Sequence, residues 1–319
     1  MRKQDPATRT LLNVNLGYKP LQWYTYGQLP DIFASDPYYQ VRLWESYGAH
    51  PQRREAYAKA EWIYAVSSIA RTAGAPRPLH IILYSCRRGE GRIEEDPEDG
   101  PAKKRTPSTM HRWATPAEKR LEAYYAIAGG AKGISYWWFT PTDGRSQGLG
   151  SDHPQAKALW REVGLIGAEL RTAGPVLLRS VPAGLPLKPA PGVFARTLVA
   201  GTDTVVLVAA NDRHRNTDKG TDIQPIENAR ITLDVPSWLK PRHVFVIDAA
   251  GIQDIHTRGG VDSLTIPLGT LDVTRMVIVT SDATLRERLS GLYKQKFAAN
   301  VAKLTAGKTG GVSAVPEPE

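Results

Sequence analysis

The sequence predicts a chain of two fold classes, an α/β part followed by an all-β part. In the first part, strand and helix patterns alternate, as they do in repeating β/α units with a parallel sheet. After Gly174 the helical period disappears, and short strand patterns follow one another between turn residues, which favours an antiparallel β-sandwich. We therefore divide the chain into residues 1–174, a β-sandwich over 175–282, a helix over 283–304 and a disordered tail over 305–319.

The best-defined unit is a helix and a strand between residues 115 and 144. Thr115 and Glu118 have the spacing of a capping box, and apolar residues then recur at helical spacing to give one apolar stripe. Gly129 and Gly130 end the helix, because glycine adopts the left-handed cap geometry without a steric penalty. The run Ile-Ser-Tyr-Trp-Trp-Phe that follows is rich in β-formers and predicts a buried strand.

The remaining elements follow from the same periodicities. In the first part, strands are expected over residues 11–16, 31–35 and 79–84, and helices over residues 55–72 and 154–172. In the second part, strands are expected over residues 194–200, 204–210, 230–235, 243–248, 263–267 and 275–280. We expect residues 11–16 to form an exposed apolar sheet edge, which is a place where a further strand would pair.

Composition and charge exclude several classes of protein. The 319 residues contain no apolar run near the roughly 18 residues that a membrane helix needs, and residues 1–10 lack the apolar core of a secretory signal. The compartment is therefore left unknown. The net charge of +9 is spread along the chain without a nucleic-acid-binding motif, so we expect no nucleic acid and no membrane among its partners.

The residues from Thr115 to Trp138 follow the pattern T-P-x-E-x-R…Y-x-A-x-A-x-G-A-x-G-[IL]-x-Y-W. This stretch resembles the last helix and the eighth strand of the (β/α)8 (TIM) barrel in glycoside hydrolases of the β-galactosidase-like and agarase-like superfamily. The resemblance implies the C-terminal half of such a barrel, with about four strands, followed by a β-sandwich. A closed barrel needs eight strands and about 250 residues, so we expect either a fragment of a longer protein, with Met1 an internal methionine, or a missing half that another polypeptide supplies.

Glycoside hydrolysis uses two carboxyl groups, about 5–5.5 Å apart in retaining enzymes and about 6.5–9.5 Å apart in inverting ones. The resemblance implies an acid/base after strand four, which lies outside this chain, and a nucleophilic glutamate at the end of strand seven. The matching strand, residues 79–84, ends without a glutamate, and Glu90 in the loop beyond it is the candidate. Asp36 follows a strand directly in DIFASDPYYQ and is the second candidate, either as a catalytic or substrate-binding carboxylate or as a turn residue that caps the strand.

Aromatic residues gather beside these carboxylates. Tyr38 and Tyr39 are candidate sugar-contacting rings. Trp137 and Trp138 should point to opposite sides of their strand, so that one faces the barrel interior as a sugar platform, while the alternative for both is core filling. Asp143 is either a further cleft carboxylate or an ordinary turn residue before glycine.

Metals and cofactors are not expected. The acidic loop over residues 90–104 has oxygen ligands but lacks the spacing of a known calcium loop, so a solvated, mobile loop is the preferred reading. The histidines are scattered, which disfavours zinc, and no P-loop or dinucleotide fingerprint is present. The single cysteine, Cys86, is expected to be an inert thiol at the edge of the core.

Two functions remain open at this point. The first is a carbohydrate-active, glycoside hydrolase-like protein that binds an oligo- or polysaccharide, as a fragment or degenerate form whose acid/base lies outside this chain. The second is a non-catalytic carbohydrate-binding or structural module. A cleft with two carboxylates at hydrolase separation favours the enzyme, and an aromatic groove without such a pair favours the binding module.

Overall fold

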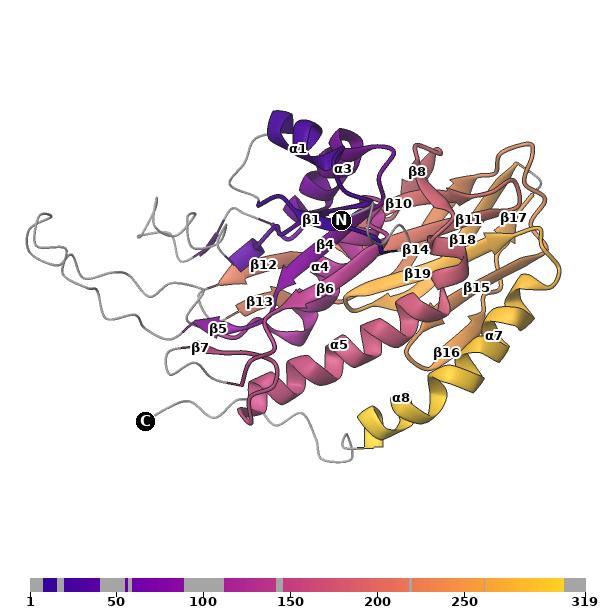
Figure 1. Cartoon of the computed structure of the whole chain (residues 1–319). Coiled ribbons are helices and arrows are strands. Elements are labelled where there is room, and N and C mark those ends of the chain that lie inside the picture. Colours follow the sequence, from indigo (N-terminus) through magenta and orange to yellow (C-terminus); the bar gives the residue numbers. More distant parts are fainter. Residues whose placement is uncertain are drawn as a thin grey trace, which may run out of the picture.

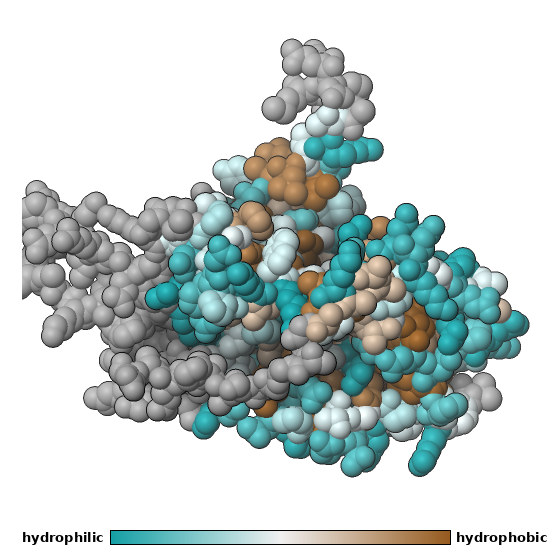
Figure 2. All heavy atoms as spheres, turned by 90° about the horizontal axis from the view of Figure 1, so that it is seen from below, coloured by the Kyte–Doolittle hydropathy of each residue, from teal (hydrophilic) through white to brown (hydrophobic). Residues whose placement is uncertain are grey.

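The computed structural model describes most of the chain. The described residues are 8–15, 20–40, 55–56, 59–88, 112–141, 146–217, 220–260 and 262–306. Within them, no helix is both long enough and apolar enough to cross a membrane. The face shown in Figure 2 is largely hydrophilic, with hydrophobic side chains in separate patches between polar ones.

The first part of the chain builds a four-stranded parallel sheet (Figure 1). Its strand order is β1-β2-β4-β6, and each neighbouring pair is parallel. The strands are β1 (Leu11–Asn13), β2 (Ile32–Ser35), β4 (Leu79–Tyr84) and β6 (Gly133–Trp137). The accompanying helices are α1 (Pro20–Gly27), α3 (Trp62–Gly74), α4 (Pro116–Ala128) and α5 (Pro154–Thr172). The predicted alternation of strands and helices is confirmed.

Strand β1 forms one edge of this sheet. All three of its residues are exposed, and the side chain of Leu11 keeps 51% of its surface in contact with solvent. The predicted exposed edge is therefore present over Leu11–Asn13, although the strand is shorter than residues 11–16.

The helix predicted over residues 55–72 begins later than expected. Helix α3 starts at Trp62, whereas Glu55–Ala56 form the short strand β3. Strand β3 pairs with β12 (His214–Thr217), which also pairs with β13 (Gly220–Ile223). A pairing partner so distant in the sequence overrides the local helical pattern.

The second part contains two antiparallel sheets. The six-stranded sheet has the order β16-β15-β19-β11-β10-β8, and the four-stranded sheet has the order β17-β18-β14-β9. The strands of the first are β16 (Gly251–Asp254), β15 (His243–Asp248), β19 (Thr274–Thr280), β11 (Thr204–Asn211), β10 (Val193–Ala200) and β8 (Ser180–Ala183). Those of the second are β17 (Arg258–Gly259), β18 (Ser263–Leu271), β14 (Ile226–Asp234) and β9 (Leu187–Pro189). Every predicted strand of this part corresponds to one of these.

The six-stranded sheet is covered on both faces. One hydrophobic cluster fills the space between the two antiparallel sheets, and it includes Leu207 and Ile231. A second, larger cluster joins the opposite face of the six-stranded sheet to the helices of the first part, and it includes Val208 and Tyr125. Consequently all eight residues of β11 are buried.

Helix α4 lies between the parallel sheet, α5 and the six-stranded sheet. The predicted capping box is present, since the Thr115 hydroxyl accepts the Glu118 N–H at 3.2 Å and the Glu118 carboxylate accepts the Thr115 N–H at 2.7 Å. The prediction of a single apolar stripe was incomplete. The charged residues Glu118, Lys119 and Glu122 are also fully buried, because the helix is packed on several sides.

The C-terminal helix predicted over residues 283–304 is two helices, α7 (Leu285–Lys296) and α8 (Ala298–Thr305). They are separated by Phe297, whose backbone leaves the helical region at φ −124°. Its ring lies under the Arg171 guanidinium at 5.2 Å, so packing against α5 holds the break. Three short elements complete the described fold, namely α6 (Gly174–Leu177), β5 (Arg87–Arg88) and β7 (Ser146–Gln147).

Candidate functional site

Three aromatic rings meet at the carboxyl ends of the parallel strands. Tyr38 follows β2, Tyr84 ends β4 and Trp137 ends β6. The rings of Tyr38 and Trp137 stack, with centroids 5.6 Å apart and planes at 26°, and both contact Tyr84 at 5.5 Å and 5.7 Å. We call Tyr38, Tyr84 and Trp137 the aromatic cluster. The indole of Trp137 is 37% exposed, so the cluster has one face open to solvent.

Asp36 lies against this cluster. Its side chain is 5% exposed and accepts a hydrogen bond from the Tyr38 hydroxyl. Burial raises the pKa of Tyr38, and the neighbouring carboxylate raises it further. Tyr38 is therefore held as a neutral donor to Asp36, which suits a residue that orients a carboxylate. The Cys86 thiol is buried near Tyr38 and forms no disulfide.

The two tryptophans do not point to opposite sides as predicted. Their rings stack on one another with centroids 5.2 Å apart and planes at 25°. Strand β6 ends at Trp137, so the alternation of a strand no longer applies to Trp138. Trp138 thus extends the aromatic cluster rather than joining the helix-facing core.

The other candidates fall in different places. Tyr39 has no exposed surface and belongs to the main hydrophobic core, so it is not part of the open aromatic face. Glu90 and Asp143 lie outside the described residues, as does the whole acidic loop over residues 90–104. Within the described residues, no group of three metal-ligating side chains comes together.

A buried polar network between α4 and the ends of β2 and β4 lies next to the aromatic cluster, and the sequence analysis missed it. The Lys119 ammonium donates to the Glu122 carboxylate at 2.6 Å and to the main-chain carbonyl of Tyr84. Gln40, which follows β2, donates to the other oxygen of Glu122 at 2.9 Å. Burial raises the pKa of Glu122, and the Lys119 ammonium opposes that rise. The network fixes the ends of β2 and β4 to α4.

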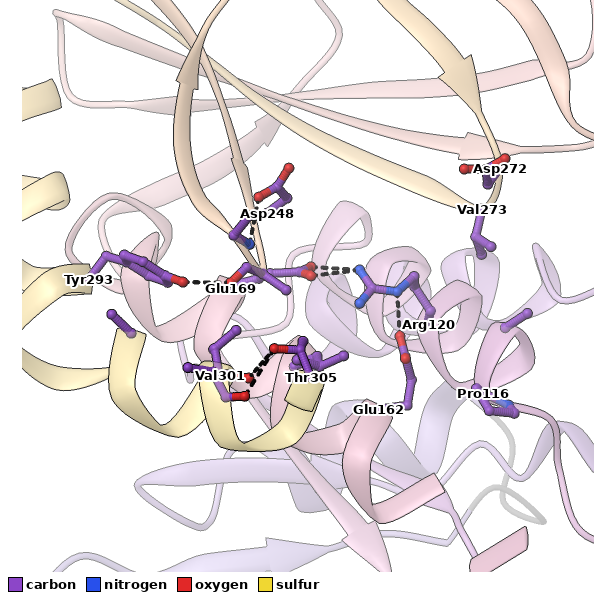
Figure 3. Close-up of a pocket in the computed structure, with 16 residues that line it drawn as sticks. Pro116, Arg120, Glu162, Glu169, Asp248, Asp272, Val273, Tyr293, Val301 and Thr305 are labelled. Atoms are coloured by element: carbon purple, nitrogen blue, oxygen red, sulfur yellow. Dashed lines mark hydrogen bonds and ion pairs between the residues drawn. The ribbon is translucent and has the colours of Figure 1, made fainter. Parts of the chain in front are cut away.

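The described residues also form a larger cleft of about 810 Å³ between α4, α5, α7, α8 and the antiparallel sheet (Figure 3). Figure 3 shows the Arg120 guanidinium between two carboxylates of α5. It binds both oxygens of Glu169 at 2.7 and 2.8 Å and Glu162 at 2.5 Å, and Tyr124 also donates to Glu169. Burial opposes the charge on Arg120, but Glu169, Tyr124 and Glu162 together outweigh it and raise the arginine's pKa.

These groups of the larger cleft use one another as partners. Asp248 accepts from the backbone N–H of Ala250 and from the side chain of Gln253, and the Tyr293 hydroxyl donates to the carbonyl of Ala249. The charges of Arg120, Glu162 and Glu169 therefore fasten α4 to α5 and are satisfied within the fold. The aromatic cluster is the better candidate site.

Comparison with known proteins gives a likeness of fold. No family model and no curated protein matches the sequence. Among solved structures, a cycloisomaltooligosaccharide glucanotransferase of a Paenibacillus species is similar over 85% of this chain and 55% of its own, with a TM-score of 0.54 and 8% identity. A family 30 subfamily 8 xylanase from Clostridium acetobutylicum is similar over 86% of this chain and 57% of its own, with a TM-score of 0.40 and 12% identity. A family 51 arabinofuranosidase from Xanthomonas axonopodis pv. citri is similar over 86% and 59%, with a TM-score of 0.41 and 10% identity.

The chain thus spans somewhat more than half the length of each of these structures. At 8% identity the match to the glucanotransferase shows the fold alone. That fold is glycoside hydrolase-like, as the resemblance in the sequence implied.

Proposed function

We propose that this chain is a carbohydrate-active, glycoside hydrolase-like protein that binds an oligo- or polysaccharide on the aromatic cluster and Trp138. The observation that carries the proposal is the meeting of Tyr38, Tyr84 and Trp137 beside Asp36 at the carboxyl ends of three adjacent parallel strands. Ligands of α/β folds bind at that end of the sheet. Flat rings offer stacking faces for sugars, and a buried carboxylate accepts hydroxyl donors.

We propose further that the parallel sheet is the C-terminal half of a (β/α)8 barrel and that the antiparallel sheets are its β-sandwich. The parallel strand order β1-β2-β4-β6 and the likeness in fold to the glucanotransferase support this. On this proposal a longer parent chain or another polypeptide supplies the missing strands, together with the catalytic acid/base.

Catalysis has one candidate group among the described residues. Asp36 is the carboxylate that directly follows a parallel strand there, whereas strand β4 is followed by Ser85 and Cys86. In an enzyme, Asp36 would bind a sugar hydroxyl or act as one of two carboxylates, with Glu90 as the second candidate. The presence of one such carboxylate among the described residues also fits the second function, a non-catalytic carbohydrate-binding module, because an aromatic face needs no carboxylate pair to bind a sugar.

Calorimetric titration with neutral gluco-, galacto-, xylo- and arabino-oligosaccharides tests the proposed binding. We expect at least one to bind, and we expect Trp137→Ala to weaken it about tenfold through loss of a stacking face. The exposed Trp238, in the loop after β14, gives the matched control, and Trp238→Ala should bind like the wild type. Absence of binding to every saccharide, or equal affinity of the two variants, would contradict the proposal.

Release of reducing sugar from the bound saccharide separates the two functions. If the wild type releases sugar and Asp36→Asn does not, the protein is a hydrolase that uses Asp36. Binding without release favours the binding module.

A further inference from the structure

A second, smaller cleft lies where α5 begins, beside the segment that leaves β6. Its volume is about 470 Å³, which is within the usual range for small-ligand sites. Two of its walls are the rings of Phe139 and Trp160, which meet edge to face with centroids 5.5 Å apart. The two rings are 58% and 50% exposed. Because the two exposed rings are in contact, they form one continuous apolar surface on which a ligand ring can pack.

The cleft also contains three cations. Lys157 and Arg161 come from α5, and Lys303 comes from α8, which packs beside it. Lys157 forms an ion pair with Asp152 at 3.0 Å, but in the described part of the chain neither Arg161 nor Lys303 has a carboxylate within ion-pair distance. Two cations are thus available to a ligand.

The guanidinium of Arg161 gives the most specific indication. Its Nε and Nη2 atoms are buried, and no hydrogen-bond acceptor faces them among the described residues. Buried donors in native proteins nearly always have a partner, so the Arg161 guanidinium has hydrogen-bonding capacity that the described residues leave unused. The planar fork of an arginine matches a carboxylate or sulfate group, which it binds through two parallel hydrogen bonds.

We infer that this cleft binds the acidic group of a charged saccharide, with the sugar ring against Trp160 or Phe139 and the carboxylate or sulfate on Arg161 and Lys303. Phe139 directly follows Trp138 in the sequence, so the cleft and the aromatic cluster are connected by one segment. The main-chain carbonyls of Trp138 and Phe139 both accept hydrogen bonds from backbone N–H groups of the loop that leads to α5. The net charge of +9 favours the approach of a polyanion. The inference names a substrate class for the proposed carbohydrate function and rests on that function for the sugar.

Titration of the whole chain with a matched pair of oligosaccharides tests the inference. Galacturonate hexamer carries a carboxylate on every ring, and galactose hexamer carries none. We expect the acidic hexamer to bind at least tenfold more tightly, and Arg161→Gln and Trp160→Ala each to weaken it about tenfold. Arg161→Lys should restore part of the affinity, because it keeps the charge and loses the fork.

Three controls make the result decisive. Lys296→Gln, on the exposed side of α7, removes the same charge away from the cleft and should leave the affinity unchanged. Thermal unfolding of each variant verifies that the fold is retained. Inorganic sulfate alone should bind at least a hundredfold more weakly than the acidic hexamer, because it lacks a ring to stack.

Two results would overturn the inference. The first is that the acidic hexamer binds Arg161→Gln and Lys296→Gln equally, or that the acidic and neutral hexamers bind the wild type equally. In that case, binding of the neutral saccharides and its loss in Trp137→Ala would still support the proposed function. The second is absence of binding to any saccharide, which would remove both proposals together.

Discussion

The ring of Tyr38 stacks on the indole of Trp137 across the end of strand β4, with the two centroids 5.6 Å apart. Tyr38 follows β2 and Trp137 ends β6, so the stack exists only when β2, β4 and β6 are assembled in register. The aromatic cluster therefore forms only when the parallel sheet is correctly folded.

The hydroxyl of Tyr38 is expected to stabilise the site separately from its ring. Tyr38→Phe keeps the stacking face and removes one donor to the buried Asp36 carboxylate, which should cost about 1–3 kcal/mol of unfolding free energy. Urea denaturation measures this loss. Tryptophan fluorescence of the native state should be unchanged in Tyr38→Phe and altered in Tyr38→Ala. A stability equal to that of the wild type would show that the hydrogen bond contributes nothing.

Breaking the buried pair under the cluster is expected to be more costly. Lys119→Met leaves the Glu122 carboxylate buried without its cation, and the loss should be about 3–5 kcal/mol by urea denaturation. Adding Glu122→Gln removes the stranded charge and keeps an acceptor for Gln40, so the double variant should regain much of the stability. Lys157→Met, in the solvent-exposed pair with Asp152, is the control and should change stability little.

Two glycines give a matched pair of opposite sign. A Cβ atom at Gly129 would lie 2.6 Å from the Cβ of Ser67, so Gly129→Ala should overpack the contact between α4 and α3 and cost about 1–3 kcal/mol. Gly167 lies inside α5 with nothing within 4 Å of its added Cβ, so Gly167→Ala should stabilise the helix by about 0.5–1 kcal/mol. Thermal unfolding compares the two, and a stabilised Gly129→Ala would refute the close packing described for α4.

Stability is expected to fall on mild acidification. Burial lowers the pKa of His80 and of His214 below the ordinary 6.5, so below about pH 6.5 the unfolded chain binds more protons than the folded chain. Their contribution is therefore full above that pH and is lost as the pH falls. The unfolding temperature should fall as the pH is lowered from about 7 to about 5, and His80→Gln or His214→Gln should make this decrease smaller. His256→Gln, at an exposed position, is the control, and the same slope in all three variants would contradict the assignment.

The sequence predicted the elements that local patterns determine. The bounds of α5, the capping box of α4 and strand β4 agree with the structure, because a proline at the helix start, a cap and a flanking glycine act over a few residues. The exposed edge at β1 also followed from counting strands.

Relationships between distant residues were beyond that reasoning. The pairing of β3 with β12 overrode a helical pattern, and the stacking of Trp138 on Trp137 depended on where β6 ends. Lys119 also binds the Tyr84 carbonyl and Arg120 binds carboxylates of α5, so the local pattern of α4 did not show that these charges are buried and paired. The sequence placed Asp36 and Tyr38 directly after one strand and Trp137 within another, but only the assembled sheet brings them together.

Helix α4 contacts both the parallel sheet and the six-stranded sheet, and this limits how the protein can diverge. Its Lys119 binds the carbonyl under the aromatic cluster, and its Glu118 accepts from Arg112 and from Thr221 in the antiparallel hairpin. A homologue with substitutions in α4 would need compensating substitutions in two sheets at once. New ligand preferences should therefore arise by exchange of residues at the carboxyl ends of the strands, such as Tyr38 and Trp137, while α4 is inherited nearly unchanged.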